Sequence, residues 1–127
     1  IVLNHKYDKD DPSALYITKK NDDFYYKGKY LDISKTAEYY QVFSSLFAKL
    51  PNGGEISYKE LGKEIQSRIQ KTKSKDDDEM RKFIQGNLTD ASNGFVRYAK
   101  LPANEDNGKP LIEVIRGSGV RFNNKRG

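Results

Sequence analysis

The side chains of this sequence that are best suited to chemistry are cationic groups near its C-terminal end. The stretch LIEVIRGSGVRFNN, residues 111–124, reads as two short extended runs around a tight turn. The residues in and beside this turn are Arg116, Gly117, Ser118, Gly119 and Arg121. A hairpin tip is too narrow to enclose a substrate, but it can enter the minor groove of a duplex or follow a phosphate backbone. Arginine gains there from the negative potential of the groove and bonds phosphate groups in a bidentate manner.

The composition of the hairpin leaves two interpretations open. Gly117 and Gly119 are expected to supply the positive φ values that a tight turn requires. Asn123 and Lys125 extend the polar and basic strip beyond the hairpin. In one interpretation this strip binds nucleic acid. In the other it is an ordinary exposed hairpin whose arginines keep the protein soluble.

A second group of polar side chains lies one helical turn apart upstream of the hairpin. At 100° per residue, one face of a helix starting at the acidic run 76–79 carries Lys82, Gln85, Gly86 and Thr89, flanked by Arg81. Lysine, glutamine and threonine side chains can bond base edges or phosphates. Gly86 costs about 1 kcal/mol relative to alanine in a helix interior. Either a phosphate or backbone approaches this face closely, or the helix ends near Gly86.

Catalytic constellations are missing from the sequence. The chain has one histidine, His5, and no cysteine, so it offers no histidine-based triad, cysteine nucleophile or zinc cluster. The acidic run 76–79 suits the positive start of a helix better than a metal site. Phosphate-cradling and dinucleotide-binding motifs do not occur. We therefore predict that the chain is not an enzyme and uses no metal or cofactor.

Three short strands are predicted ahead of the helices. Residues 15–34 are rich in tyrosine, isoleucine and phenylalanine, and turn signals at 21–23 and 27–29 divide them into an antiparallel meander. We interpret residues 1–14 as an N-terminal arm or linker and residues 15–127 as one domain.

Three amphipathic helices are predicted to follow. The first begins with Ser34 as N-cap and ends at PNGG, residues 51–54. The second begins at Ser57, which has capping-box spacing to Glu60, and the third begins at the acidic run. The apolar faces of the three helices consist of Ala37, Tyr40, Phe43, Leu46, Phe47 and Leu50, then Leu61, Ile65 and Ile69, then Met80, Phe83, Ile84, Leu88 and Ala91. With a very short strand at 55–57 and the closing hairpin, this order predicts a single α+β domain.

The net charge of +5 is unevenly distributed. Residues 1–80 contain 14 basic and 14 acidic residues, whereas residues 81–127 contain nine basic and four acidic residues. A one-sided basic excess is the electrostatic footprint of a nucleic-acid binder. The sequence has no apolar run long enough to span a membrane, and the absence of cysteine suits a reducing compartment. We expect a cytoplasmic protein with no membrane partner.

Three blocks of the chain, covering roughly residues 15–122, resemble the OmpR/PhoB type of winged-helix domain. They are FYYKGKYLDISKTAEYYQVFSSLF, GEISYKELGKEI and IEVIRGSGVRF, in that order. The last block is similar to the wing pattern I-x-T-V-R-G-x-G-Y-R-F of the family, with Val120 where the family has tyrosine. The third helix departs from the family pattern, because it lacks a Leu-Arg pair, and the connection 93–109 is long.

The resemblance implies a winged helix with a three-helix core, N-terminal antiparallel strands and a C-terminal β-hairpin wing. It also implies double-stranded DNA as the partner, with the third helix in the major groove and the wing on the minor groove or backbone. The chain would then be the DNA-binding domain of a transcriptional or plasmid/phage regulator, with a homodimer on repeated half-sites as one arrangement left open. The resemblance implies neither two-component signalling nor a target sequence.

Two other functions remain as alternatives. A protein-interaction winged helix would use an aromatic surface that includes Phe24, Tyr25, Tyr26 and Tyr39. A recognition module of a larger enzyme, such as a nuclease, would bind DNA through the same residues as a regulator. DNA binding requires a continuous positive surface over the wing and third helix, whereas the protein-interaction alternative predicts acids mingled over that face.

Overall fold

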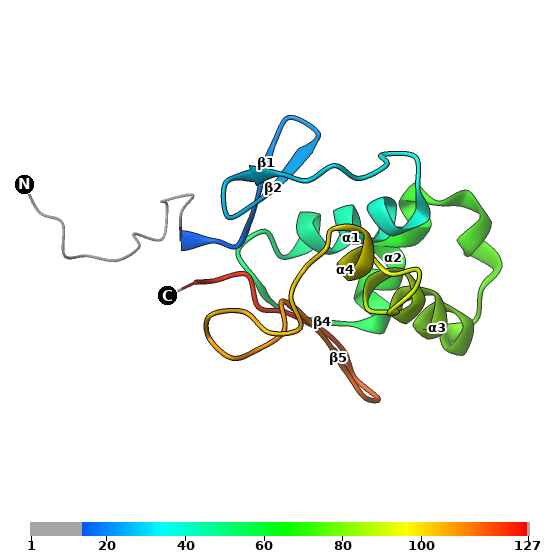
Figure 1. The fold of residues 1–127 in the computed structure, drawn as a ribbon. Helices are drawn as coiled ribbons and strands as arrows, with labels where there is room; N and C mark the ends of the chain where they lie inside the picture. Colours follow the sequence, from blue (N-terminus) through cyan, green and yellow to red (C-terminus); the bar gives the residue numbers. More distant parts are fainter. Residues whose placement is uncertain (1–13, 127) are drawn as a thin grey trace, which may run out of the picture.

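The computed structural model describes residues 14–126, which form two small antiparallel sheets, four α-helices and a 3-10 helix (Figure 1). The predicted α+β class is therefore confirmed. His5 and the arm predicted over residues 1–14 lie outside the described residues, except for Ala14. Ala14 is buried, and its carbonyl oxygen accepts a hydrogen bond of 2.7 Å from the backbone nitrogen of Arg126.

The predicted elements occur in the expected order, and two short helices that were not predicted lie among them. The strands are β1 (Ile17–Lys20), β2 (Asp23–Tyr26), β3 (Lys29–Tyr30), β4 (Gly54–Ser57), β5 (Ile112–Ile115) and β6 (Gly119–Phe122). The helices are α1 (Glu38–Lys49), α2 (Tyr58–Arg68), the 3-10 helix η2 (Gln70–Ser74), α3 (Asp77–Leu88) and α4 (Phe95–Tyr98). Three strands thus precede the helices, and a hairpin closes the domain.

The two sheets have different roles in the fold. The N-terminal sheet has the order β1-β2-β3, with antiparallel pairing throughout, as the meander predicted. The second sheet has the order β4-β6-β5, so the strand between α1 and α2 pairs with the second strand of the C-terminal hairpin. The turn that joins β5 to β6, residues 116–118, is called the wing turn below. This pairing fixes the hairpin directly beside the start of α2.

Local capping explains where two of the three main helices begin. The Ser57 side chain accepts a hydrogen bond of 3.1 Å from the backbone nitrogen of Glu60, as its capping-box spacing predicted. Asp76 and Glu79 form a reciprocal capping box at the start of α3. Each bond satisfies a backbone donor that the first helical turn would otherwise leave unpaired.

The first helix begins later than predicted. Its N-cap is Ala37 rather than Ser34, because residues 34–37 form a turn in which the Ala37 backbone nitrogen donates to the Ser34 carbonyl at 3.2 Å. The Ser34 backbone nitrogen itself donates to the Tyr39 hydroxyl at 3.1 Å. A local turn has therefore displaced the helix start by three residues.

The third helix ends earlier than its apolar pattern predicted. It stops at Leu88, and Ala91 lies exposed beyond it, so the assignment of Ala91 to the buried face is wrong. The Asp90 carboxylate accepts hydrogen bonds from the backbone nitrogens of Ser92 and Asn93 at 3.0 and 2.8 Å. This side-chain turn offers the backbone an alternative to further helix.

Aromatic side chains join both sheets to α1. The Phe43 ring stacks on Phe95 at 3.8 Å between centroids and meets Phe24 of β2 and Phe122 of β6 edge-on. A buried amide makes a second connection, because Asn124 both accepts from the Ile17 backbone nitrogen at 2.7 Å and donates to the Ile17 carbonyl at 2.9 Å. The core thus depends on contacts between the two ends of the domain.

The long loop between α4 and β5 is fastened to the N-terminal sheet by a buried carboxylate. The Tyr26 hydroxyl donates to Glu105 at 2.5 Å, and the Lys27 ammonium lies 3.9 Å from the same carboxylate oxygen. Burial and the hydrogen bond to Glu105 raise the pKa of Tyr26 well above its ordinary value. The neutral phenol is therefore the form that the folded protein holds.

The hairpin requires glycine at two positions for different structural reasons. Gly117 has φ 75°, as a tight turn predicts. Gly119 does not have positive φ, so that part of the prediction is wrong. A Cβ on Gly119 would lie 2.0 Å from the carbonyl oxygen of Ile56 in β4. Gly119 is thus required by close packing of β6 against β4.

We predict that Gly119→Ala lowers the free energy of unfolding by on the order of 3 kcal/mol or more, because the clash is with backbone that cannot move aside. Gly117→Ala should cost only about 1 kcal/mol, since its Cβ has open space and only the left-handed φ is unfavourable. Urea denaturation of both variants measures the difference. Equal losses for the two variants would contradict the packing argument.

A second prediction concerns alkaline pH. Because folding raises the pKa of Tyr26, its contribution to stability is complete below about pH 10, the ordinary value for tyrosine, and is lost as the pH rises further. Urea denaturation from neutral to alkaline pH should show this loss in the wild type and a weaker loss in Tyr26→Phe. Tyr30→Phe, which changes an exposed side chain, is the control and should retain the wild-type dependence.

Candidate nucleic-acid interface

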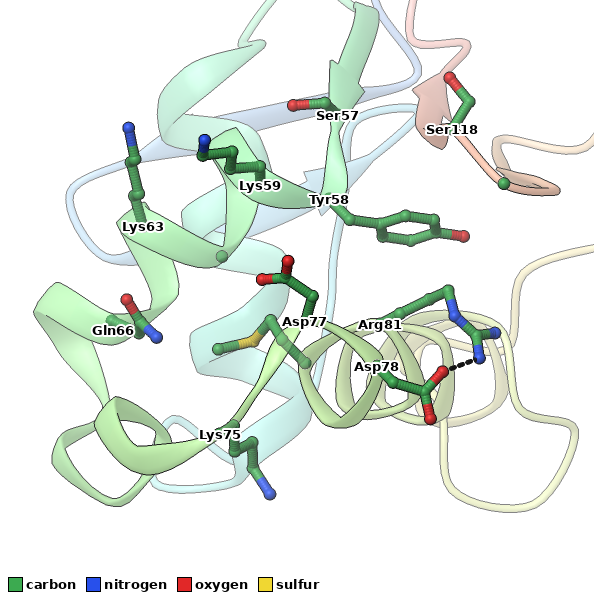
Figure 2. Close-up of a pocket in the computed structure, with 13 residues that line it drawn as sticks. Ser57, Tyr58, Lys59, Lys63, Gln66, Lys75, Asp77, Asp78, Arg81 and Ser118 are labelled. Atoms are coloured by element: carbon green, nitrogen blue, oxygen red, sulfur yellow. Dashed lines mark hydrogen bonds and ion pairs between the residues drawn. The ribbon is translucent and has the colours of Figure 1, made fainter.

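A groove of about 670 Å³ opens between α2, the first turns of α3 and the wing turn. Figure 2 shows side chains from all three parts around it. Its lining residues are Ser57, Tyr58, Lys59, Gly62, Lys63, Gln66, Lys75, Asp77, Asp78, Met80, Arg81, Gly117 and Ser118. The groove therefore brings together parts of the two segments in which the sequence predicted a site.

Backbone pairing holds the wing turn against the start of α2. Ser57, the last residue of β4 and the N-cap of α2, is paired with Gly119 in β6. The next residue, Tyr58, donates its backbone N–H to the carbonyl of Ser118 at 3.3 Å. As a result, the N-terminus of α2 and the wing turn present one continuous edge to the groove.

The charge of the groove is mixed, with four basic and two acidic side chains. Lys59 and Lys63 of α2 are exposed and have no ion-pair partner within residues 14–126. Arg81 is paired with Asp78 at 2.5 Å, and Lys82, beside the groove, lies 3.3 Å from the same carboxylate. Hydrogen bonds from Arg81 and Lys82 lower the pKa of Asp78, so this carboxylate remains charged at neutral pH.

The predicted face of the third helix is less open than its periodicity suggested. Lys82 is exposed, whereas Gln85 is half-buried and donates to the Tyr58 hydroxyl at 3.1 Å. Thr89 is the C-cap rather than a helical residue, and its hydroxyl donates to the Gln85 carbonyl at 3.3 Å. Both side chains thus also hold parts of the fold together.

Gly86 lies in the last turn of α3, which ends two residues later at Leu88, so the interpretation that the helix ends near this residue is confirmed. Nothing lies within 4 Å of the position that a Cβ would occupy on Gly86. Packing within the described domain therefore gives no reason for glycine here. The alternative, close approach of another molecule to this face, stays a prediction.

The two hairpin arginines lie in different environments. Arg116 is exposed in the wing turn and has no ion-pair partner among the described residues. Arg121 is not at the tip, as the sequence suggested, but within β6, where the register places it between Glu55 and Glu113. It lies 2.7 Å from Glu55 and 3.7 Å from Glu113, and the Glu55 carboxylate raises its pKa.

The remaining polar residues of the hairpin lie at the far end of β6 from the wing turn. Asn123 donates to the Pro110 carbonyl at 2.8 Å and to the Glu113 carboxylate at 2.6 Å. Lys125 is exposed and pairs through its backbone with Leu15. The predicted site residues therefore occupy three places: the α3 groove with the wing turn, the middle of β6, and the segment after it.

Sequence reasoning missed the contribution of α2. Lys59 and Lys63 are four residues apart on the exposed side of a helix whose start at Ser57 was recognised, so their common face could have been inferred. The aromatic surface considered as an alternative is also corrected. Phe24 and Tyr39 are buried, and the large exposed apolar side chains of the described residues are Tyr30 and Tyr98.

Comparison of the chain with protein-family models, curated proteins and solved structures gave no match. Within residues 14–126, no helix has the length and apolar character that crossing a bilayer requires. The same part of the chain contains no cluster of histidine, cysteine and carboxylate side chains that could hold a metal ion.

The substitution Gly86→Ala is expected to change stability and binding in opposite directions. The substitution should raise the free energy of unfolding by about 1 kcal/mol, because alanine is the better helix former and its methyl group meets no neighbour. If another molecule approaches this face, the same variant should bind it more weakly. Chemical denaturation measures the first effect, and a decrease in stability would show that the helix backbone at this residue is not regular.

Proposed function

We propose that this chain is a winged-helix domain that binds duplex DNA through the α3 groove and the wing turn. The observation that carries the proposal is the pairing of β6 with β4, the strand that leads directly into α2. Together with the order β4, α2, α3, β5, β6, this pairing supports the assignment of the β5–β6 hairpin as a wing. It also makes the α2 N-terminus, α3 and the wing turn border one groove.

The side chains around this groove suit a phosphate backbone. Lys59, Lys63 and Arg116 are exposed cations without ion-pair partners in the described domain, so DNA binding would not have to break an existing ion pair at these positions. Lysine and arginine side chains that contact phosphates fix the place of a protein on the duplex, whereas side chains of the inserted helix read the base edges. Lys82 and Gln85 of α3 are the candidates for that reading.

A second candidate function is protein binding, and the charge of α3 favours it. Asp77 and Asp78 lie on the same part of the surface as Arg81 and Lys82, which is the mixture expected of a protein interface. Away from this groove, Tyr98 is 43% exposed and stacks on Tyr39 at 4.4 Å between centroids. Binding of DNA would have to compete with Asp78 for Arg81 and Lys82.

Fluorescence-anisotropy titration of mixed-sequence duplex DNA over a salt series tests the proposal. Lys59→Gln/Arg116→Gln should weaken binding and reduce the slope of log affinity against log salt by about two, because two phosphate contacts are lost. Lys20→Gln/Lys29→Gln is the matched control, since it removes the same charge from the N-terminal sheet.

Three results are informative. A reduced slope in the groove variant but not in the control supports the α3 groove as the DNA contact. An equal change in both variants means that only net charge matters and contradicts the assigned groove. No binding at low salt by a sample with a cooperative unfolding transition contradicts DNA binding and favours the protein partner.

A further inference from the structure

A second groove, of about 540 Å³, lies at the other end of the β4-β6-β5 sheet from the wing turn. It is bordered by the turn 52–54 ahead of β4, the loop 107–109 and the segment 122–126. Every charged residue in its lining is basic: Lys109, Lys125 and Arg126. Lys109 and Lys125 are exposed, and neither has an ion-pair partner among residues 14–126. Arg126 lies 3.8 Å from Asp106, which is not part of the lining.

The walls of this groove are fixed by internal contacts. Asn124 donates to the Pro51 carbonyl at 3.0 Å and so ties the segment after β6 to the turn ahead of β4. Gly53, with φ 93°, lets the two walls touch, because a Cβ there would lie 2.8 Å from the Phe122 carbonyl oxygen. The loop 107–109 forms the third wall, and a hydrogen bond of 2.8 Å from the Glu105 backbone nitrogen to the Lys109 carbonyl holds its shape. A ligand would therefore meet a preformed site and would have little chain to order on binding.

We infer that this groove binds the phosphodiester backbone of nucleic acid without reading its sequence. Lysine, arginine and asparagine are side chains that contact phosphate oxygens, and the groove adds the exposed amides of Asn52 and Asn107 to its three cations. The aromatic residue of its lining, Phe122, is only 1% exposed, so no ring is available for a base to stack on. The lining has no other apolar side chain among the described residues, so a peptide would find no exposed aromatic or aliphatic side chain to pack against.

This site is independent of the α3 groove. The two grooves have no lining residue in common, and β6 separates the wing turn from Lys125. A variant of Lys109 and Lys125 leaves Lys59, Arg116 and α3 unchanged. The failure of one site can therefore be observed separately from the failure of the other.

The test is a salt series of duplex binding by Lys109→Gln/Lys125→Gln, with Lys20→Gln/Lys29→Gln as the matched charge control. Both lysines of the groove are exposed, so the fold should be retained, and an unfolding curve verifies it. The groove variant should lower the slope of log affinity against log salt by about two, equally for two duplexes of unrelated sequence. The control should leave the slope close to that of the wild type.

The other outcomes decide whether the assignment stands. A slope equal to that of the control shows that no phosphate of the duplex contacts the groove. If calorimetry then detects inorganic tripolyphosphate binding to the wild type but not to the variant, the ligand is a small phosphate compound instead of nucleic acid. If polyglutamate instead binds the wild type and Lys59→Gln/Arg116→Gln but not Lys109→Gln/Lys125→Gln, and displaces no duplex, the groove is assigned to acidic proteins. If the Lys59/Arg116 variant matches the control while the Lys109/Lys125 variant loses slope, the second groove stands and the α3 groove fails.

Discussion

The antiparallel pairing of β4 with β6 is the interaction on which the other features of this domain depend. It connects the strand between α1 and α2 to the last strand of the chain, and its close approach at Gly119 leaves no space for a side chain. One end of the pair places the wing turn beside α2, and the other end borders the groove that contains Lys125. The four residue pairs between β4 and β6 thus position both candidate binding surfaces.

The electrostatics of the two surfaces differ in a way that net charge does not reveal. At the α3 groove, Asp78 is paired with Arg81 and with the neighbouring Lys82, and along β6 the carboxylates of Glu55 and Glu113 are paired with Arg121. A residue's formal charge therefore overstates what it offers to a ligand. Exposed cations without an ion-pair partner among residues 14–126 include Lys59 and Lys63 of α2, Arg116 of the wing turn, and Lys109 and Lys125 at the far end of β6.

The sequence predicted those features that short stretches of chain determine. The cap at Ser57, the start of α3 at the acidic run 76–79 and the closing hairpin depend on neighbours within a few residues, and they were predicted. The start of α1 was placed wrongly because a turn at Ser34 competed with the helix, which apolar spacing cannot show. The ion pair of Arg121 with Glu55 could not be predicted, because Glu55 lies 66 residues away and reaches it only through the strand register.

The buried amide of Asn124 has a consequence for how the protein is made. It bonds to Ile17 across a separation of 107 residues, so β1 is held by the segment that follows β6. Contacts this distant in sequence form late and slow the folding of a small domain. During synthesis, this contact cannot form until the segment after β6 has left the ribosome, so folding of the domain is completed only once that segment has been translated.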